Sequence, residues 1–337
     1  MTDKSKASVV VLFSGGLDSS IAILMMLKQK IEVRALMFLT HFGCEISDRS
    51  SCSQNPYPIA EKFGFQVQLC HLGENFIDVV RNPRFGHGKN MNPCIDCRIM
   101  MLQEAKYVME QTGAVAVVTG EVLGQRPLSQ TRDRLNLVER ESGLRGKLLR
   151  PLSARLLKPT IPESEGIIDR NLLESIAGRG RSRQMQLAEE FGLDDYPNPA
   201  SGCLLTDPNY SRRLKDLFKH VPQVLPDDVN LLKVGRHFRF SPESKIVVGR
   251  NKSDNEAMLK YRNSTSVVLE AKDTGSPITL LIGEASEEAI IAAARATARY
   301  CDQKREESVR VTVTHPDREE VIEVAPADDS TLTEIML

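Results

Sequence analysis

The stretch from Val9 to Leu27, VVVLFSGGLDSSIAILMML, places a short polar loop between two apolar runs. The first run is short and β-branched, which favours a buried strand, whereas the second run favours a helix. The glycine, aspartate and serine residues at the junction predict a tight strand-to-helix turn. Because the start of a helix presents unpaired backbone N–H groups and the positive end of the helix dipole, this turn suits a bound phosphate.

Strands alternate with helices through the first half of the chain. The strand-like segments are SVVVLF, EVRALMFL, QVQLCHL and AVAVVTG, and helical patterns lie between them at SSIAILMMLKQK, NPYPIAEKFG and residues 97–111. This alternation predicts an α/β domain in which helices cover both faces of a parallel sheet.

A second domain is predicted to start at the polar segment LPDDVN. Beyond it, NLLKVGRHFRF, KIVVGR, SVVLEAK and PITLLIG read as strands, and DNEAMLKY and SEEAIIAAARATARYCDQKR read as helices, so a smaller α+β domain is expected. We therefore predict domains over residues 1–224 and 225–315. An acidic C-terminal segment, residues 316–337, is expected to pair as a strand at EEVIEV and to end as a tail.

Length and composition narrow the class of protein. A chain of 337 residues is long enough for two domains, and a formal net charge of -1 by itself indicates no nucleic-acid partner. No run approaches the roughly 18 apolar residues of a membrane span and the N-terminus lacks a signal-peptide pattern, so we expect a cytoplasmic protein without a membrane partner. Seven cysteines, with two of them in a CxxC, favour metal or redox chemistry over a secreted disulfide framework.

The segment SGGLDSS resembles the PP-loop of the ATP pyrophosphatase superfamily, whose signature is SGGxDS. It lacks the lysine of a Walker A loop. The resemblance implies an adenine nucleotide alpha hydrolase-like fold that binds Mg-ATP and cuts it between the α and β phosphates, which leaves an adenylated substrate. Asp18 is a catalytic candidate, because its carboxylate suits Mg²⁺, although it also suits a helix cap. The candidate ATP-binding residues here are Ser14, Gly15, Gly16, Asp18, Ser19 and Ser20, with Met37 on the next strand.

The segment VVTGEVLGQRPLSQT, residues 117–131, resembles the TGExxGQxxSQT segment of the bacterial and archaeal tRNA 4-thiouridine synthases. In that family the segment follows a core strand and lines the nucleotide and target site. The resemblance implies that Gly120, Glu121 and Gln125 bind ATP. It also implies that Ser129 and Gln130 contact RNA.

The segment KNMNPCIDCRIMML resembles the NPC(x)xCNxxIKF segment of the tRNA 2-thiouridylases. It places Cys94 and Cys97 at a loop-to-helix junction, where a helix dipole is expected to lower the pKa of both thiols. Cys203, in NPASGCLLTDP, stands similarly to the second functional cysteine of both families. These three cysteines are the catalytic and metal-binding candidates.

Three chemistries remain open for the cysteines. Three protein ligands are the pattern of thiolation enzymes that hold a [4Fe-4S] cluster and leave one iron open for an inorganic sulfide. A persulfide on Cys203 needs only one CxxC thiol to resolve it, and a zinc site normally needs four ligands. Cys70 and Cys301 are predicted to be core thiols, whereas Cys44 and Cys52 follow the second strand as loop thiols or sulfur relays.

A basic stretch is the first candidate for RNA binding. Residues 126–183 contain 13 Lys or Arg and 7 Asp or Glu, an excess that suits phosphate contacts. Its densest part, GRGRSRQ, contributes Arg179, Arg181 and Arg183, although a solvated helix start is an equal interpretation. The 4-thiouridine synthases carry an RNA-binding module ahead of the PP-loop, whereas here the loop begins at Ser14, so we expect RNA capture from other segments.

The C-terminal part is the second candidate. VGRHFRF and KIVVGRNKSDNEAML resemble the RNA-binding domain of the NFACT proteins, in the version fused to PP-loop domains. Without this resemblance the domain reads equally as a dimerisation module. The exposed contacts that it implies are Arg236, His237, Arg239, Arg250, Asn251 and Lys252.

Together the resemblances imply an ATP-dependent RNA sulfurtransferase similar to the tRNA thiouridine synthases. A base carbonyl oxygen would attack the α-phosphate, pyrophosphate would leave, and sulfur from the cluster or a persulfide would displace AMP. The partners would be tRNA or another RNA, and a sulfur donor that is free sulfide or a separate carrier. The alternatives are an amide-forming PP-loop ligase and an RNA-binding protein that senses ATP without cleaving it.

Overall fold

The VVVL run forms β1 (Ser8–Leu12), the central strand of a five-stranded sheet. Its neighbours are β2 (Glu32–Leu39) and β4 (Ala116–Thr119), and β3 (Gln66–His71) and β5 (Leu148–Leu149) complete the order β3-β2-β1-β4-β5. All four strand pairs are parallel. Because β1 is covered on both faces, its sequence is continuously apolar rather than alternating. The predicted α/β class with a parallel sheet is confirmed.

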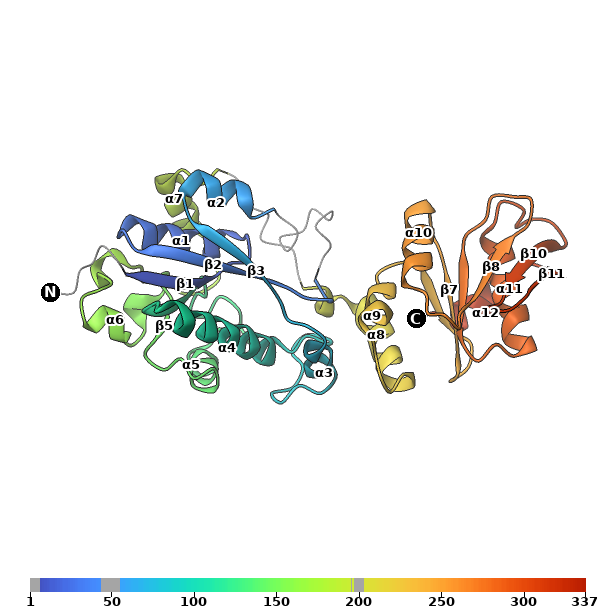
Figure 1. Cartoon of the computed structure of the whole chain (residues 1–337), viewed down its shortest axis with the longest axis horizontal. Helices are drawn as coiled ribbons and strands as arrows, with labels where there is room; N and C mark the ends of the chain where they lie inside the picture. The colour runs from blue at the N-terminus through green and yellow to red at the C-terminus, as the bar shows by residue number, and fades with distance from the viewer. Residues whose placement is uncertain (1–6, 44–54, 195, 197–202) are drawn as a thin grey trace. The chain divides into compact units, whose positions relative to one another are not determined.

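Figure 1 shows the computed structural model, which describes residues 7–43, 55–194, 196 and 203–337. The chain divides into two units, Met1–Leu204 and Leu205–Leu337. Cys44 and Cys52 lie outside the described residues, as does the stretch 197–202 before Cys203.

Helices cover both faces of the parallel sheet (Figure 1). On one face, Val9 and Val11 of β1 pack with residues of α1 (Leu17–Lys28) and α7 (Ser182–Phe191). On the other face, Val10 and Leu12 pack with residues of α4 and α5. The remaining bounds in this unit are α2 (Tyr57–Phe63), α3 (Asn75–Arg81), α4 (Cys94–Thr112), α5 (Arg132–Glu141), η2 (Ala154–Leu156), α6 (Ile161–Ser164) and η3 (Arg170–Leu172). The short helix η4 (Leu204–Thr206) spans the boundary between the two units.

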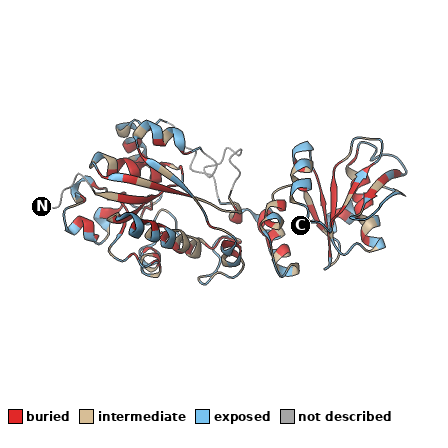
Figure 2. Ribbon diagram, viewed as in Figure 1, coloured by how far each residue is buried: buried red, intermediate tan, exposed pale blue. Residues whose placement is uncertain are grey.

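The second unit contains a six-stranded antiparallel sheet in the order β11-β10-β8-β9-β7-β6. Apolar residues of α11 pack on one face, and residues of α9 and α10 pack against β7 and β9 on the other. Figure 2 shows buried residues on the strands of both units and on the inward faces of their helices. The element bounds are α8 (Pro208–His220), α9 (Pro226–Leu231), β6 (Arg236–Arg239), β7 (Ser244–Val248), α10 (Lys252–Tyr261), β8 (Val267–Ala271), β9 (Thr279–Gly283), α11 (Glu287–Tyr300), β10 (Val309–Thr314), β11 (Glu319–Val324) and α12 (Asp329–Glu334).

The second unit starts earlier than the LPDDVN segment, where the sequence places the boundary. Helix α8 belongs to this unit, because Arg213 Nη1 donates to the Leu232 carbonyl at 3.0 Å and Asp216 accepts two bonds from Arg239. The side chain of Tyr210, also on α8, is buried. These contacts assign α8 to the second unit, although the polar segment LPDDVN comes after this helix in the chain.

The acidic C-terminal segment is part of the second sheet. Strand β11, which contains EEVIEV, pairs antiparallel with β10 as expected. The chain does not end as a free tail, because α12 follows and Leu337 N donates to the His237 carbonyl at 2.9 Å. Arg239 N also donates to the Ile335 carbonyl at 2.9 Å. These backbone bonds hold the last residues against β6.

A buried lysine in the second unit predicts a pH-dependent stability. Lys245 is 6% exposed, and its Nζ lies 3.8 Å from Asp216 Oδ2, an atom that Arg239 also approaches at 2.6 Å. Burial lowers the pKa of Lys245 from 10.5 to about 8. Between these two values the unfolded chain binds one proton more than the folded chain, so this residue makes the free energy of unfolding rise with pH.

We expect Lys245→Met to raise the free energy of unfolding by about 1 to 3 kcal/mol at neutral pH, because Asp216 keeps its arginine partner. The gain should shrink as the pH approaches 10, where wild-type Lys245 is already neutral in the folded chain. Urea unfolding of both full chains from pH 7 to pH 10 measures it. Lys252→Met, at a side chain that is 92% exposed, is the control and should change little. A gain that does not vary with pH would contradict the assignment.

No helix in the described ranges is both long enough and apolar enough to cross a membrane.

Candidate functional site

The predicted PP-loop is a turn between β1 and α1. Gly15 has a φ of 73°, a left-handed conformation that favours glycine. Gly16 is the N-cap of α1, and no described side chain caps the first turn. The backbone N–H groups at this helix start are therefore available to an anion, as the sequence predicts.

The three serines of the loop have different roles. Ser19 Oγ donates to the Gly16 carbonyl at 2.9 Å, and Ser20 Oγ donates to the same oxygen at 3.1 Å. Both residues are buried, so their hydroxyls shape the turn. Ser14 is exposed, and its hydroxyl lies 3.2 Å from that of Ser19. Ser14 is thus the serine side chain of this loop that is open to a ligand in solution.

Asp18 has one carboxylate oxygen engaged and one unsatisfied. Gln125 Nε2 donates to Asp18 Oδ2 at 3.0 Å. Asp18 Oδ1 is buried and has no hydrogen-bond partner among the described residues. A buried carboxylate oxygen without a donor is costly, and a hard cation is the kind of partner that would satisfy it. The donor chemistry at Asp18 therefore fits Mg²⁺.

Gly120 lets the segment after β4 rest on the start of α1. A Cβ at this position would lie 2.6 Å from the carbonyl carbon of Asp18 and from the nitrogen of Ser19. Because both atoms belong to backbone, no rotation of a side chain relieves such a contact. Glycine at this position is required by the close approach of two backbones.

Gly120→Ala is therefore expected to displace the start of α1. We expect it to weaken ATP binding, measured by titration calorimetry, and to lower the free energy of unfolding by about 1 to 3 kcal/mol. Gly180→Ala is the matched control, because a Cβ there meets no described atom within 4 Å. Equal ATP affinity in the Gly120 variant and wild type would contradict the close packing.

Glu121, the residue after Gly120, is ion-paired with the cysteine helix α4. Its carboxylate accepts from Arg150 Nε at 3.1 Å and from Thr119 Oγ1 at 3.2 Å, and it lies 3.3 Å from Arg98 Nε. Burial alone would raise the pKa of Glu121, but the Arg98 and Arg150 charges hold it below its ordinary value. Both oxygens are engaged with protein groups. Glu121, predicted to bind ATP, thus has a positioning role in this structure.

Gln130, predicted to contact RNA, is buried and closes the loop that precedes α5. Its side-chain carbonyl accepts from Arg126 N at 3.1 Å, and its backbone carbonyl accepts from Gly124 N at 2.8 Å. Ser129 is partly exposed beside it. Met37 is 5% exposed on β2, where it is paired in register with Leu69.

The two CxxC cysteines occupy the first turn of α4. Cys94 is the first residue of the helix, and its thiol donates to Asn92 Oδ1 at 3.1 Å. Burial raises the pKa of Cys94 despite the Arg126 and Arg98 charges. Burial also raises the pKa of Cys97 to about 12, against the influence of Arg98. The prediction that the helix dipole lowers both values is wrong, because loss of solvation outweighs the field at the helix start.

Cys203 lies within electrostatic reach of the CxxC. A charge on Cys203 or Cys94 adds to the rise in the pKa of Cys97. Cys203 is exposed, whereas Cys94 and Cys97 are partly covered. The donor set of three soft thiols suits iron or zinc, and the cations of Arg98 and Arg126 would offset thiolate charge. Among the described residues, however, no three His, Cys, Asp or Glu side chains come close enough together to hold a metal ion.

The other described cysteines are Cys70 and Cys301. Cys301 is buried, as predicted for a core thiol, and Cys70 is partly buried in β3.

The side chains that sequence reasoning missed are Arg98, Arg150 and Asn92. Arg98 directly follows the CxxC, and this position is the sequence signal that could have marked it as a site residue.

The arginines predicted to bind RNA in the first unit differ in ion pairing and in solvent exposure. Arg183 donates to Glu174 and to Glu190, each at 2.7 Å. Its charge is therefore already paired. Arg179 is exposed and Arg181 is the partly exposed N-cap of α7.

The RNA contacts predicted in the second unit are largely engaged within the protein. Arg239 forms a bidentate pair with Asp216, and Arg250 pairs with Asp254. Arg236 lies over the Tyr300 ring at 4.4 Å. Arg239 and Arg250 each have a carboxylate partner within the unit, so they are weaker candidates for phosphate contacts than the sequence implies.

His237 corrects the prediction of an exposed RNA contact. It is 0% exposed, and its Nε2 lies 2.8 Å from the Val234 carbonyl. Burial lowers the pKa of His237 well below its ordinary value, so it is a neutral core residue. Asn251 caps α10 by accepting from Asp254 N at 2.9 Å. Arg250, Asn251 and Lys252 are the exposed members of the predicted set.

Residues 4–158 match the family described as thiamine biosynthesis protein (ThiI), and residues 235–336 match the NFACT protein RNA binding domain. A probable tRNA sulfurtransferase from Lysinibacillus sphaericus is 31% identical over 150 residues, which cover 44% of this chain and 35% of that protein. A tRNA sulfurtransferase from Klebsiella pneumoniae is 26% identical over 273 residues, which cover 79% of this chain and 46% of that protein. The chain thus spans less than half the length of these curated relatives.

A crystal structure of a 4-thiouridine synthetase–RNA complex with bound ATP has a TM-score of 0.37 and is 21% identical, covering 66% of this chain and 53% of that chain. The two matched families confirm, each for its own segment, the resemblances drawn from SGGLDSS, TGEVLGQ and the C-terminal motifs.

Proposed function

We propose that the chain is an ATP-dependent RNA sulfurtransferase that adenylates a base carbonyl oxygen of tRNA and replaces that oxygen with sulfur. The observation that carries the proposal is the pair Gly120 and Glu121. Gly120 rests on the backbone of Asp18 in the nucleotide loop, and Glu121 is ion-paired with Arg98, the neighbour of Cys97. Two consecutive residues thus connect an ATP-binding loop to a group of thiols. This arrangement suits activation by ATP followed by attack of sulfur.

In the activation step, the N–H groups at the start of α1 and the Ser14 hydroxyl hold the phosphates. Asp18 would hold Mg²⁺, which when bound neutralises charge on the phosphates and the leaving pyrophosphate. Gln125 keeps one oxygen of Asp18 engaged and so orients the other. Adenylation converts the base oxygen into a good leaving group, because AMP departs more easily than hydroxide.

In the sulfur step, Cys94, Cys97 and Cys203 supply the thiols. The Arg98 and Arg126 charges act against burial at Cys94, so they favour its thiolate. Cys94, Cys97 and Cys203 would hold a [4Fe-4S] cluster through their thiolates, and such a cluster would supply inorganic sulfide to the activated base. The exposure of Cys203 favours a second candidate, in which this thiol carries the sulfur as a persulfide. For the cluster the donor would be free sulfide, whereas the persulfide on Cys203 would need a separate carrier that passes on sulfur already at the persulfide level.

The test combines the purified chain with Mg-ATP, sodium sulfide and an unmodified tRNA transcript. The expected result is release of pyrophosphate that depends on RNA, together with a thiolated nucleoside found by mass spectrometry of the digested RNA. Omission of ATP should abolish both signals. Pyrophosphate release that ammonia supports and that leaves no sulfur in the RNA would favour the amide-forming ligase instead. ATP binding without cleavage would favour the ATP-sensing protein.

A further inference from the structure

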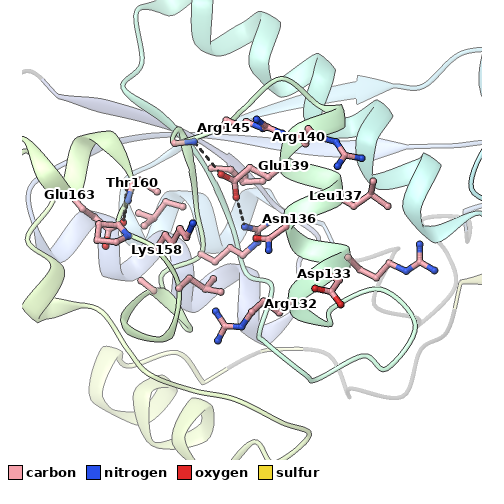
Figure 3. Close-up of a pocket in the computed structure, with 18 residues that line it drawn as sticks. Arg132, Asp133, Asn136, Leu137, Glu139, Arg140, Arg145, Lys158, Thr160 and Glu163 are labelled. Atoms are coloured by element: carbon pink, nitrogen blue, oxygen red, sulfur yellow. Dashed lines mark hydrogen bonds and ion pairs between the residues drawn. The ribbon is translucent and has the colours of Figure 1, made fainter.

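A basic pocket of about 780 Å³ lies beside β5, one of the two edge strands of the parallel sheet (Figure 3). Helix α5 forms one wall, and the segment from Ala154 to Glu163 forms another. Leu148, Leu149 and Leu157 are among the apolar lining residues. The lining does not include Ser14–Ser20 or the candidate cysteines, so this pocket is separate from the site described above.

Cations outnumber carboxylates in the lining. The carboxylates are Asp133, Glu139 and Glu163. Two of them are already engaged: Glu139 accepts from Gly146 N and from Arg150, and Glu163 accepts from Thr160 and pairs with Arg170. The cations of the lining are Arg132, Arg134, Arg140, Arg145, Arg150 and Lys158.

Four of these cations are not neutralised by a described carboxylate. Arg150 pairs with Glu121 and Glu139, and Arg140 pairs with Glu141. In the described part of the chain, the side chains of Arg134, Arg145 and Lys158 have neither a hydrogen bond nor an ion pair. Arg132 donates only to the carbonyl of Leu156, at 3.2 Å. These four positive charges line one pocket and repel each other. A bound anion would relieve this repulsion, so the pocket favours an anionic ligand.

The cations are spread along the pocket rather than converging on one point. Arg132 begins α5 and Arg140 lies in its last turn, so they are about 12 Å apart along the helix axis at 1.5 Å per residue. Figure 3 shows Arg140 and Arg145 at the opposite end of the view from Arg132. One phosphate group is too small to contact both ends. A chain of phosphates with sugars between them would match both the row of cations and the apolar lining.

We propose that this pocket binds successive phosphodiester groups of the RNA substrate, with Arg132, Arg134, Arg145 and Lys158 as the phosphate contacts. The proposal rests on the proposed function for the identity of the polyanion, and within the basic stretch of residues 126–183 it assigns the phosphate contacts to one pocket. Such contacts hold a nucleic acid in register and carry no sequence information.

The test is the salt dependence of binding between the full chain and a fluorescein-labelled, unmodified tRNA transcript, without ATP. A variant with Arg134→Gln, Arg145→Gln and Lys158→Gln loses three phosphate contacts. We expect the slope of log K against log salt to become shallower by about 3, or about 1 per contact, and tRNA binding to weaken by at least about 10-fold. The matched control, Lys30→Gln, Arg34→Gln and Lys106→Gln, removes the same charge elsewhere on this unit.

The outcomes separate this proposal from the proposed function. A shallower slope in the pocket variant alone supports the pocket, whether or not the chain thiolates RNA. Equal slopes in both variants overturn it, since net charge then explains the binding. If the pocket variant loses binding of inorganic pyrophosphate but binds tRNA as wild type does, the pocket proposal is also overturned, in favour of a free phosphate ligand. Failure of wild type to bind tRNA overturns both proposals, whereas normal tRNA binding without thiolation sinks the proposed function alone. Circular dichroism checks that each variant folds.

Discussion

Asp18→Asn is expected to reduce ATP-dependent pyrophosphate release by at least about 100-fold, because it removes the charge that would hold Mg²⁺ on the phosphates. Asparagine has nearly the same shape as aspartate, and its side-chain oxygen still accepts from Gln125. The fold should therefore persist while the site loses its anion. The measurement is the rate of pyrophosphate release at increasing Mg²⁺ concentration, with the thermal midpoint recorded alongside.

Asp78→Asn is the matched control for this change. Asp78 is also an acidic residue in the first turn of a helix, in this case α3, and it is exposed. We expect the control to release pyrophosphate at the wild-type rate. Retention of most activity in Asp18→Asn would contradict a role of the Asp18 carboxylate in holding Mg²⁺.

Cys97→Ala and Cys203→Ala are each expected to lower RNA thiolation by at least about 100-fold while pyrophosphate release stays within about threefold of wild type. In the proposed mechanism the thiols act after adenylation, so their loss should leave the adenylation step intact. The measurement is thiolated nucleoside by mass spectrometry and pyrophosphate in the same reaction. Cys70→Ala removes a partly buried thiol of β3 and serves as the control.

The same variants distinguish the two sulfur chemistries. A cluster with three ligands predicts that the anaerobically purified wild type contains iron and sulfide, and that Cys94→Ala, Cys97→Ala and Cys203→Ala each lose them. Persulfide chemistry predicts an iron-free protein in which Cys203 and only one CxxC thiol are required. Normal thiolation by Cys203→Ala would contradict both chemistries.

Local patterns in the sequence were sufficient for the parts of the site that one segment builds alone. The run from Val9 to Leu27 predicts a buried strand, a tight turn and a helix, and these are β1, the loop and α1. The CxxC was placed correctly at a helix start. Strand and helix periods also predicted both domain classes. These features depend on neighbours in the chain, so composition and spacing carry them.

Tertiary structure decided which polar side chains are available to a ligand. Glu121, Arg183 and Arg239 look like free site residues in sequence, but in the folded chain each is held by charged partners. His237 looks exposed between two arginines of β6, yet it is buried. The free energy of a charge depends on its solvation and on its nearest opposite charge, and neither quantity can be read from a local pattern.

The cysteines and the basic pocket show the same division. The sequence alone determined that three candidate thiols, an SGGxDS loop and a basic stretch are present. Only the folded structure determines the burial that raises the pKa of Cys97, and the further rise that a charge on Cys203 causes. Folding also places Arg134, Arg145 and Lys158 in the lining of one pocket. Burial and charge pairing arise from packing between segments far apart in the chain, which is why they became visible only in three dimensions.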